Sequence, residues 1–416
     1  MRKIIIEGGF PLRGEVTISG AKNAVLPLMA ASLLADGTCF IDDAPLLSDV
    51  KIMCRVLDSL GAKTSLKNKQ LQIDTTGVNG KEAPGELVRK MRASFLIMGP
   101  LLAKKGQVKM FLPGGCNIGS RPIDLHLKGF EAMGVEVSIG HNYITANCPQ
   151  LQGNRIYLDF PSVGATENLM MAASLAEGTT IIENAAAEPE IVDLSNFLSA
   201  MGAKIKGAGT NVIRIKGVKS LRPIQHTVIP DRIEAGTFMV AAAAIGEQVI
   251  IKNIIPEHLK SITAKLEETG ALIKEYDDHL IIQKSPEIKP LDIKTLPYPG
   301  FPTDMQAQFM ALLTKAKGSS SVRETVFENR FMHVDELKKM GADITVKDHT
   351  AIINGVSRLK GNPVSATDLR AGAALIIAGL TAENTTSINE TYHIERGYDD
   401  ICAKFSTLGA KIKFLT

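Results

Sequence analysis

The ten residues "FLSAMGAKIK", Phe197 to Lys206, occur in similar form six times along a chain of 416 residues. The other copies are "LDSLGAKTSL" (57–66), "FEAMGVEVSI" (130–139), "LEETGALIKE" (266–275), "LKKMGADITV" (337–346) and "FSTLGAKIKF" (405–414). Their shared glycines are Gly61, Gly134, Gly202, Gly270, Gly341 and Gly409, so successive copies are 73, 68, 68, 71 and 68 residues apart. Such a period indicates six structural repeats of about 70 residues.

Each copy predicts the same local structure. An amphipathic helix runs up to the shared glycine, which suits the left-handed conformation that ends many helices. Alternating β-branched residues follow, as in "NKQLQID" (68–74) and "DDHLIIQ" (277–283), and predict strands. Upstream lies a second helix rich in Ala, Gly and Met, as in "LMMAASLAEG" (169–178), whose small residues let it be packed on all sides. We therefore predict an α/β protein of two domains with three repeats each, helices inside and sheets outside.

Length and composition agree with a large globular protein. A chain of 416 residues exceeds the size at which one core stops growing, so two domains are expected. The net charge of +3 is spread along the chain without basic runs, which argues against a nucleic-acid or membrane partner. The start "MRKIIIEGGF" lacks the apolar region of an export signal. The apolar stretches 238–246 and 373–380 are about half the length of a membrane span and predict buried helices.

The cysteines favour a reducing compartment. There are five of them, an odd number with no paired spacing: Cys39, Cys54, Cys116, Cys148 and Cys402. This pattern indicates neither a disulfide framework nor a zinc site, so we expect a cytoplasmic protein. Cys116 differs from the rest, because "LPGGCNIGSRP" (112–122) sets it among glycines in a segment predicted to be an exposed loop.

The starts of the six inner helices are the best candidates for a ligand site. They are "SGAKNA" (19–24), "VRKMRAS" (88–94), "PSVGATEN" (161–168), "IPDRIEAG" (229–236), "FPTDMQAQ" (301–308) and "SATDLRAG" (365–372). Free N–H groups and the helix dipole favour an anion at such starts. Lys22, Arg92 and Arg370 are cations where the dipole disfavours them, which predicts a bound anion. The alternative is that the polar residues here are only helix caps, as for Ser162, Thr166 and Asp304.

Five of these motifs together resemble the UDP-N-acetylglucosamine enolpyruvyl transferases, also called 1-carboxyvinyltransferases. They are "SGAKNA", "LPGGCNIGSRPIDLHL", "SVGATEN", "FPTDMQAQ" and "DLRAGAAL", and the resemblance covers the whole chain. The related enolpyruvylshikimate phosphate synthases share the sixfold fold but lack the cysteine loop, and they are the first alternative. A non-catalytic paralogue that senses UDP-sugars is the second.

The resemblance implies the fold, the reaction and the partners. The fold would be a two-domain inside-out α/β barrel, with one domain at 22–229 and the other formed by 1–21 and 230–416. The reaction would move enolpyruvyl from phosphoenolpyruvate to the 3'-hydroxyl of UDP-N-acetylglucosamine in peptidoglycan synthesis, with no metal or organic cofactor. Fosfomycin would be a covalent inhibitor at Cys116.

The resemblance also implies roles for individual residues. The catalytic residues would be Cys116 as proton donor to C3, Asp304 as base, and Lys22 and Arg396. Phosphoenolpyruvate would be bound by Lys22, Asn23, Arg121, Arg370 and Arg396. The UDP-sugar would be bound by Arg92, Arg121, Pro122, Ile123, Asp124, Leu125, Ser162, Val163, Gly164, Asp304 and Val326.

Three further positions have more than one interpretation. His126 and Arg330 belong either to the site or to a hydrogen-bonded surface network, and the same alternatives hold for Asp124. Phe160 stands where some family members carry a lysine ahead of the SVG turn. A pyrophosphate contact at that position would therefore have to come from another cation.

Overall fold

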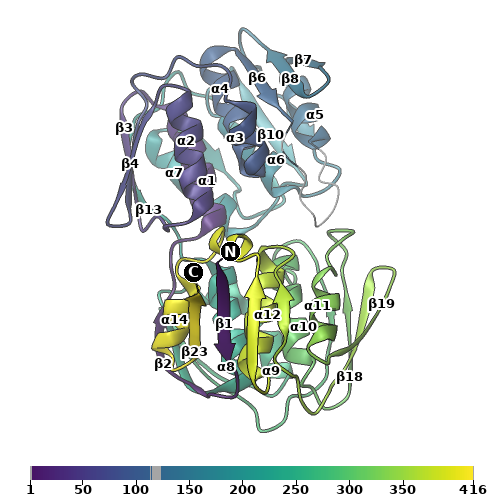
Figure 1. Ribbon diagram of the computed structural model, residues 1–416. Helices are drawn as coiled ribbons and strands as arrows, with labels where there is room; N and C mark the ends of the chain where they lie inside the picture. The colour runs from purple at the N-terminus through teal and green to yellow at the C-terminus, as the bar shows by residue number, and fades with distance from the viewer. Residues whose placement is uncertain (1, 113, 115–122, 416) are drawn as a thin grey trace. The chain divides into compact units, whose positions relative to one another are not determined.

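The structure is a computed structural model that describes residues 2–112, 114 and 123–415 (Figure 1). The chain forms two compact units, whose boundaries lie at Ser19/Gly20 and Ile229/Pro230. We call residues 20–112, 114 and 123–229 the central unit, and residues 2–19 and 230–415 the terminal unit. Each unit has its own hydrophobic core, so each has the burial that a domain needs.

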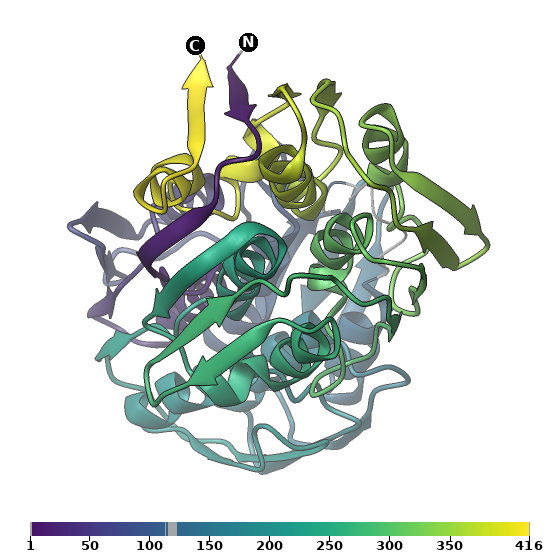
Figure 2. The same ribbon diagram turned by 90° about the horizontal axis from the view of Figure 1, so that it is seen from below.

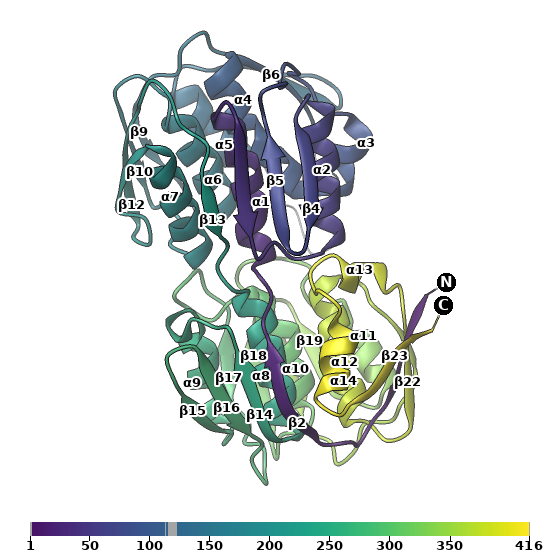
Figure 3. The same cartoon turned by 90° about the vertical axis from the view of Figure 1, so that its left-hand side faces the viewer.

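The central unit is mixed α/β. Its helices are α1 (Lys22–Ala31), η1 (Ser32–Leu34), α2 (Ser48–Ser59), α3 (Gly85–Lys90), η2 (Arg92–Ile97), α4 (Met98–Lys105), α5 (Asp124–Ala132), α6 (Val163–Ala173) and α7 (Pro189–Met201). Its strands are β3 (Thr38–Asp42), β4 (Lys63–Lys67), β5 (Gln70–Asp74), β6 (Gln107–Phe111), β7 (Glu136–Ile139), β8 (Tyr143–Asn147), β9 (Arg155–Tyr157), β10 (Thr179–Glu183), β11 (Lys204–Lys206), β12 (Val212–Lys216) and β13 (Gln225–Thr227). The described strands form sheets of order β13-β3-β5-β4, β6-β8-β7 and β11-β12-β10-β9; Figure 3 shows β4 beside β5.

The terminal unit has the same composition of elements. Its helices are α8 (Arg232–Ile245), η3 (Pro256–Leu259), α9 (Lys260–Glu268), η4 (Thr303–Met305), α10 (Gln306–Leu313), α11 (His333–Lys339), α12 (Leu369–Thr381), α13 (Tyr392–Glu395) and α14 (Ile401–Thr407). Its strands are β1 (Lys3–Glu7), β2 (Leu12–Thr17), β14 (Gly246–Lys252), β15 (Leu272–Glu275), β16 (His279–Gln283), β17 (Asp292–Lys294), β18 (Ser319–Arg323), β19 (Asp343–Lys347), β20 (Thr350–Asn354), β21 (Pro363–Ser365), β22 (Thr385–Asn389) and β23 (Lys411–Leu415). The sheets have the orders β15-β16-β14-β2, β17-β18-β20-β19 and β21-β22-β1-β23.

The six repeat glycines have the predicted conformation. All six have a positive φ, between 88° and 117°, and lie one or two residues after the ends of α2, α5, α7, α9, α11 and α14. A side chain is strained in that region, and glycine is not, which explains its recurrence. After five of these glycines the chain forms an antiparallel hairpin: β4–β5, β7–β8, β11–β12, β15–β16 or β19–β20.

The sixth copy is completed by the other end of the chain. Strand β23 follows Gly409 and pairs in antiparallel register with β1, from Lys3 opposite Leu415 to Glu7 opposite Lys411. Strand β1 lies between β22 and β23, as Figure 2 shows at the edge that carries both termini. The next strand, β2, pairs in parallel with β14. The first residues are therefore an internal part of the terminal unit.

The inner helices are buried over almost their whole length, as their composition predicts. Helices α8, α10 and α12 pack against one another. Every residue of α10 and the stretches 233–243 of α8 and 370–380 of α12 are buried. Among the described residues no sheet closes into a barrel. Within the same residues, no helix has the length and apolar character that a membrane span requires.

Candidate functional site

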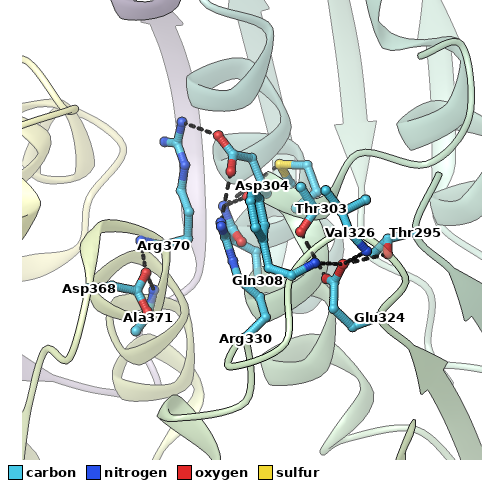
Figure 4. Close-up of polar contacts among 12 residues, drawn as sticks. Thr295, Thr303, Asp304, Gln308, Glu324, Val326, Arg330, Asp368, Arg370 and Ala371 are labelled. Carbon is cyan, nitrogen blue, oxygen red and sulfur yellow. Dashed lines mark hydrogen bonds and ion pairs between the residues drawn. The ribbon is translucent and has the colours of Figure 1, made fainter. Parts of the chain in front are cut away.

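Asp304 lies in η4, where the chain enters α10, and it is held by two arginines (Figure 4). Its Oδ1 accepts a hydrogen bond of 2.7 Å from Arg330 Nη2, and its Oδ2 accepts one of 2.9 Å from Arg370 Nη2. The cap hypothesis is therefore wrong for Asp304. It is correct for Ser162, whose hydroxyl accepts from the backbone N–H of Ala165. It is wrong for Thr166, which lies inside α6 and accepts from the N–H of Ala186.

The cluster of Asp304, Arg330 and Arg370 carries a surplus of positive charge. The arginine side chains are each 4% exposed, and the Asp304 side chain is 27% exposed. Burial alone would raise the pKa of Asp304, but the charges of Arg370 and Arg330 outweigh it and hold that pKa well below its usual range. Two guanidinium groups face one carboxylate, and guanidinium forks suit carboxylate and phosphate. These three side chains together carry one net positive charge, which suits an anion.

Helix α12 presents Arg370 to this cluster. Asp368 caps the helix by accepting from the N–H groups of Arg370 and Ala371, which fixes the backbone at Arg370. The cation that the sequence singled out at this helix start thus has a counter-ion within the protein, Asp304. The same holds in the central unit, where Lys22 Nζ lies 2.7 Å from Oδ2 of the buried Asp49. Asn23, the next residue of α1, is exposed.

A second carboxylate, Glu324, organises the turn that contains Val326. Glu324 is 1% exposed. Its oxygens accept hydrogen bonds of 2.8 Å from the hydroxyls of Thr295 and Thr303 and from the N–H of Val326. Because Thr303 precedes Asp304, one buried acid fixes both the Val326 turn and the entry to η4 (Figure 4).

Arg396 lies just after α13, in a loop that also contains Tyr398. Arg396 is half-buried, and Tyr398 is buried. The hydroxyl of Tyr398 accepts a hydrogen bond of 3.2 Å from Arg370 Nη1. The loop that carries one candidate anion-binding arginine therefore contacts another one.

In the central unit, His126 connects two of the candidate UDP-sugar segments. Asn168 Nδ2 lies 3.1 Å from His126 Nδ1 and also donates to the carbonyl of Phe95, so Nδ1 accepts and Nε2 carries the proton. A Cβ placed on Gly164 would lie 3.4 Å from His126 Cε1, so the imidazole packs on the Ser162–Gly164 turn. His126 thus joins the start of α5, with Asp124 and Leu125, to the start of α6. His126 is therefore part of a hydrogen-bonded network, but this network is buried and not on the surface.

Some of the other predicted site residues lie at the starts of helices in the central unit, and the rest lie outside the described residues. Arg92 opens η2 and is half-buried, and Ile123 and Val163 are half-buried at the starts of α5 and α6. Phe160 is 43% exposed, and the nearby Lys128 pairs with Asp159 at 2.7 Å. Three predicted residues lie outside the described residues: Cys116, Arg121 and Pro122.

Sequence reasoning missed several residues that shape the Asp304 cluster. These are Thr237, Gln308, Glu324 and Tyr398. Each is buried, and each has a recognisable signal in the sequence. Thr237 and Gln308 are polar residues inside otherwise apolar helices, Glu324 is an acid directly after a strand, and Tyr398 lies in the polar stretch "IERGYDD" (394–400). These signals mark buried polar groups, which need partners.

The buried His333 predicts a specific pH dependence of stability. Burial lowers its pKa to about 4, Asp368 opposes the shift and Arg330 adds to it. The folded state therefore holds a neutral imidazole, and stability is lost as pH falls below the unfolded pKa of about 6.5. Relative to a His333→Gln variant, the wild-type free energy of unfolding should fall by about 2 kcal/mol from pH 7.5 to pH 5.

Denaturant unfolding of both proteins at several pH values measures this difference. His141→Gln, at an exposed position, is the matched control and should leave the difference from wild type constant. Parallel pH curves for wild type and His333→Gln would contradict the prediction.

The chain matches one protein family over nearly its whole length. Residues 6–405 match the family model described as EPSP synthase (3-phosphoshikimate 1-carboxyvinyltransferase). UDP-N-acetylglucosamine 1-carboxyvinyltransferase 2 of Carboxydothermus hydrogenoformans is 59% identical over 415 residues, 99% of each chain. UDP-N-acetylglucosamine 1-carboxyvinyltransferase 1 of Caldanaerobacter subterraneus subsp. tengcongensis is 58% identical over 410 residues, again 99% of each.

Two solved structures share the fold. The enolpyruvyl transferase NikO from Streptomyces tendae superimposes with a TM-score of 0.90 at 24% identity, covering 100% of this chain and 99% of that one. EPSP synthase from Acinetobacter baumannii gives a TM-score of 0.78 at 19% identity over all of both chains. At these identities the likeness establishes the mixed α/β fold alone.

Proposed function

The chain belongs to the EPSP synthase family and, within it, to the UDP-N-acetylglucosamine 1-carboxyvinyltransferases, and from this membership we propose its reaction. It transfers enolpyruvyl from phosphoenolpyruvate to the 3'-hydroxyl of UDP-N-acetylglucosamine and releases phosphate, the first committed step of peptidoglycan synthesis, in the cytoplasm. The observation that carries this proposal is the 59% identity across 99% of the chain.

The reaction is redox-neutral and balances with its two substrates. The 3'-oxygen loses its proton to a base and bonds to C2 of phosphoenolpyruvate, while C3 gains a proton. From this tetrahedral intermediate C3 loses a proton and phosphate leaves C2, which restores the double bond. The protein must therefore supply a base, an acid and positive charge for the migrating negative charge.

Asp304 is the proposed base, and its two arginines control its basicity. While Arg330 and Arg370 both pair with it, its low pKa makes it a weak proton acceptor. The phosphate and carboxylate of phosphoenolpyruvate compete for the same guanidinium groups. When Arg370 shares its charge with this substrate, the pKa of Asp304 rises towards a useful range. The carboxylate is thus a stronger base when phosphoenolpyruvate is bound.

The remaining roles follow the family assignments. Cys116 donates the proton to C3, and Lys22, Asn23, Arg121 and Arg396 bind phosphoenolpyruvate with Arg370. The family's UDP-sugar contacts include the Ser162–Gly164 turn and Val326, whose N–H the Glu324 carboxylate holds. The finer architecture belongs to the same proposal: six repeats in an inside-out arrangement, with domains at 22–229 and at 1–21 plus 230–416.

Phosphate release on mixing the protein with phosphoenolpyruvate and an acceptor tests the proposal. UDP-N-acetylglucosamine should support release, and shikimate 3-phosphate should not. Release with shikimate 3-phosphate alone would favour the synthase alternative. Binding of UDP-N-acetylglucosamine without any release would favour the sensor alternative.

A further inference from the structure

Tyr398 belongs to a closed ring of hydrogen bonds behind the Asp304 cluster. It is 3% exposed, and its hydroxyl lies 3.2 Å from Arg370 Nη1 and 2.9 Å from Thr237 Oγ1. Thr237, on α8, lies 3.2 Å from Gln308 Nε2, and Gln308 also donates to the carbonyl of Asp304 at 2.9 Å. Arg370 returns the ring to the Asp304 side chain (Figure 4). Three inner helices and the 396–400 loop are joined by it.

The donor and acceptor types of the neighbouring groups determine where the hydroxyl protons of Tyr398 and Thr237 point. A guanidinium only donates, so the Tyr398 oxygen accepts from Arg370. The Thr237 hydroxyl lies 2.8 Å from the carbonyl of Ile233, which only accepts, so the threonine proton points there. The phenol proton therefore points to the Thr237 oxygen. Burial raises the pKa of Tyr398 although Arg370 opposes it, so the phenol is protonated at neutral pH.

With its proton on the Thr237 side, the Tyr398 hydroxyl holds Arg370 Nη1 by a hydrogen bond that does not depend on Asp304. The guanidinium carbon also lies 5.6 Å from the centre of the Tyr398 ring. Arginine has a long flexible side chain that loses rotamer freedom when it is held in one orientation. Nη1 donates to the phenol oxygen and Nη2 donates to Asp304. When a bound anion replaces Asp304 as the partner of Nη2, the bond from Nη1 to Tyr398 still holds the guanidinium in the same orientation.

We propose that Tyr398 is a positioning residue for the reaction, acting through Arg370 with Thr237 as the group that orients the phenol. This inference rests on the proposed function, because it assigns Arg370 to phosphoenolpyruvate. It differs from a packing role, in which the aromatic ring alone would matter.

The Tyr398→Phe variant separates the two roles, because it keeps the ring and removes the hydroxyl. We expect kcat/KM for phosphoenolpyruvate to fall about tenfold, the scale of one hydrogen bond to a charged group. The Kd of UDP-N-acetylglucosamine should stay within about twofold of wild type. Tyr392→Phe, at an exposed tyrosine on α13, is the matched control and should leave both constants unchanged.

Two further arms keep the test decisive if Tyr398→Phe folds poorly. Thr237→Val should lower the same kcat/KM, and Thr237→Ser, which retains the hydroxyl, should restore it. An Arg370→Lys background removes the Nη1 donor, so adding Tyr398→Phe there should cost little more.

The outcomes separate this inference from the proposed function. A wild-type protein that releases no phosphate would overturn the proposed function, and this inference with it. An active wild type with an unaffected Tyr398→Phe variant would overturn only the positioning role. So would full additivity of Tyr398→Phe with Arg370→Lys, or equal activities of Thr237→Val and Thr237→Ser.

Discussion

Replacing Asp304 with alanine should lower the turnover number by at least about 100-fold, the usual scale for loss of a general base. The affinity for UDP-N-acetylglucosamine should stay within about tenfold, because a group used mainly in the transition state contributes little to ground-state binding. The two arginines lose their internal counter-ion in this variant. Phosphoenolpyruvate should therefore bind at least as tightly as it binds the wild type.

Steady-state kinetics and equilibrium titration with the sugar nucleotide check these expectations. Asp304→Asn keeps the shape and a hydrogen-bond acceptor but removes the charge and the basicity, and it should be as slow as the alanine variant. Asp277→Ala, at an exposed position, is the control. Near-normal turnover of Asp304→Asn would reduce Asp304 to an ion-pair partner of Arg330 and Arg370.

The Cys116→Ser variant should lose most activity, since a hydroxyl is far too weak an acid to replace a thiol as proton donor to C3. Cys116→Asp keeps an ionisable acid of similar reach, so it should retain turnover. It lacks the soft sulfur nucleophile, so it should lose both alkylation by fosfomycin and a covalent adduct with phosphoenolpyruvate. Phosphate release and intact-mass measurements test these expectations; a serine variant as active as wild type would contradict them.

The other thiols provide an internal control for the labelling. Cys39, Cys148 and Cys402 are buried, with at most 4% exposed. Burial raises the pKa of Cys39 and Cys54, and raises that of Cys402 to about 12, so these thiols offer little thiolate. Peptide mapping should find an epoxide label on Cys116 first. Label mainly on another cysteine would contradict the assignment.

Local features of the fold could be predicted from the sequence because they depend on neighbouring residues. The positive φ of Gly202 and its five equivalents follows from a helix that must stop before a hairpin. The burial of α8 and α12 follows from their uniformly apolar faces. A capping role for Ser162 is equally local, because its hydroxyl reaches an N–H three residues away.

The ion pairs of the site could not be predicted in this way. Asp304 is 26 residues from Arg330 and 66 residues from Arg370 in the sequence. The side chains meet only in the folded unit, where α10 packs against α12. The sequence showed cations at helix starts and predicted an external anion. The packed elements also supply an internal counter-ion, Asp304 for Arg370 and Asp49 for Lys22, and the external anion stays a prediction.

Because β1 lies between β22 and β23, it cannot pair with either strand until that strand has been synthesised. At about 5 to 20 residues per second, Ile4 and Ile6 leave the ribosome about 20 to 80 s before Lys411 is made. The central unit is complete long before that, so it can fold while β1 is still unpaired. An unpaired apolar strand is prone to associate with other chains. Strand β1 therefore stays without its neighbours in the sheet until β22 and β23 have also been translated, and it needs protection over that interval.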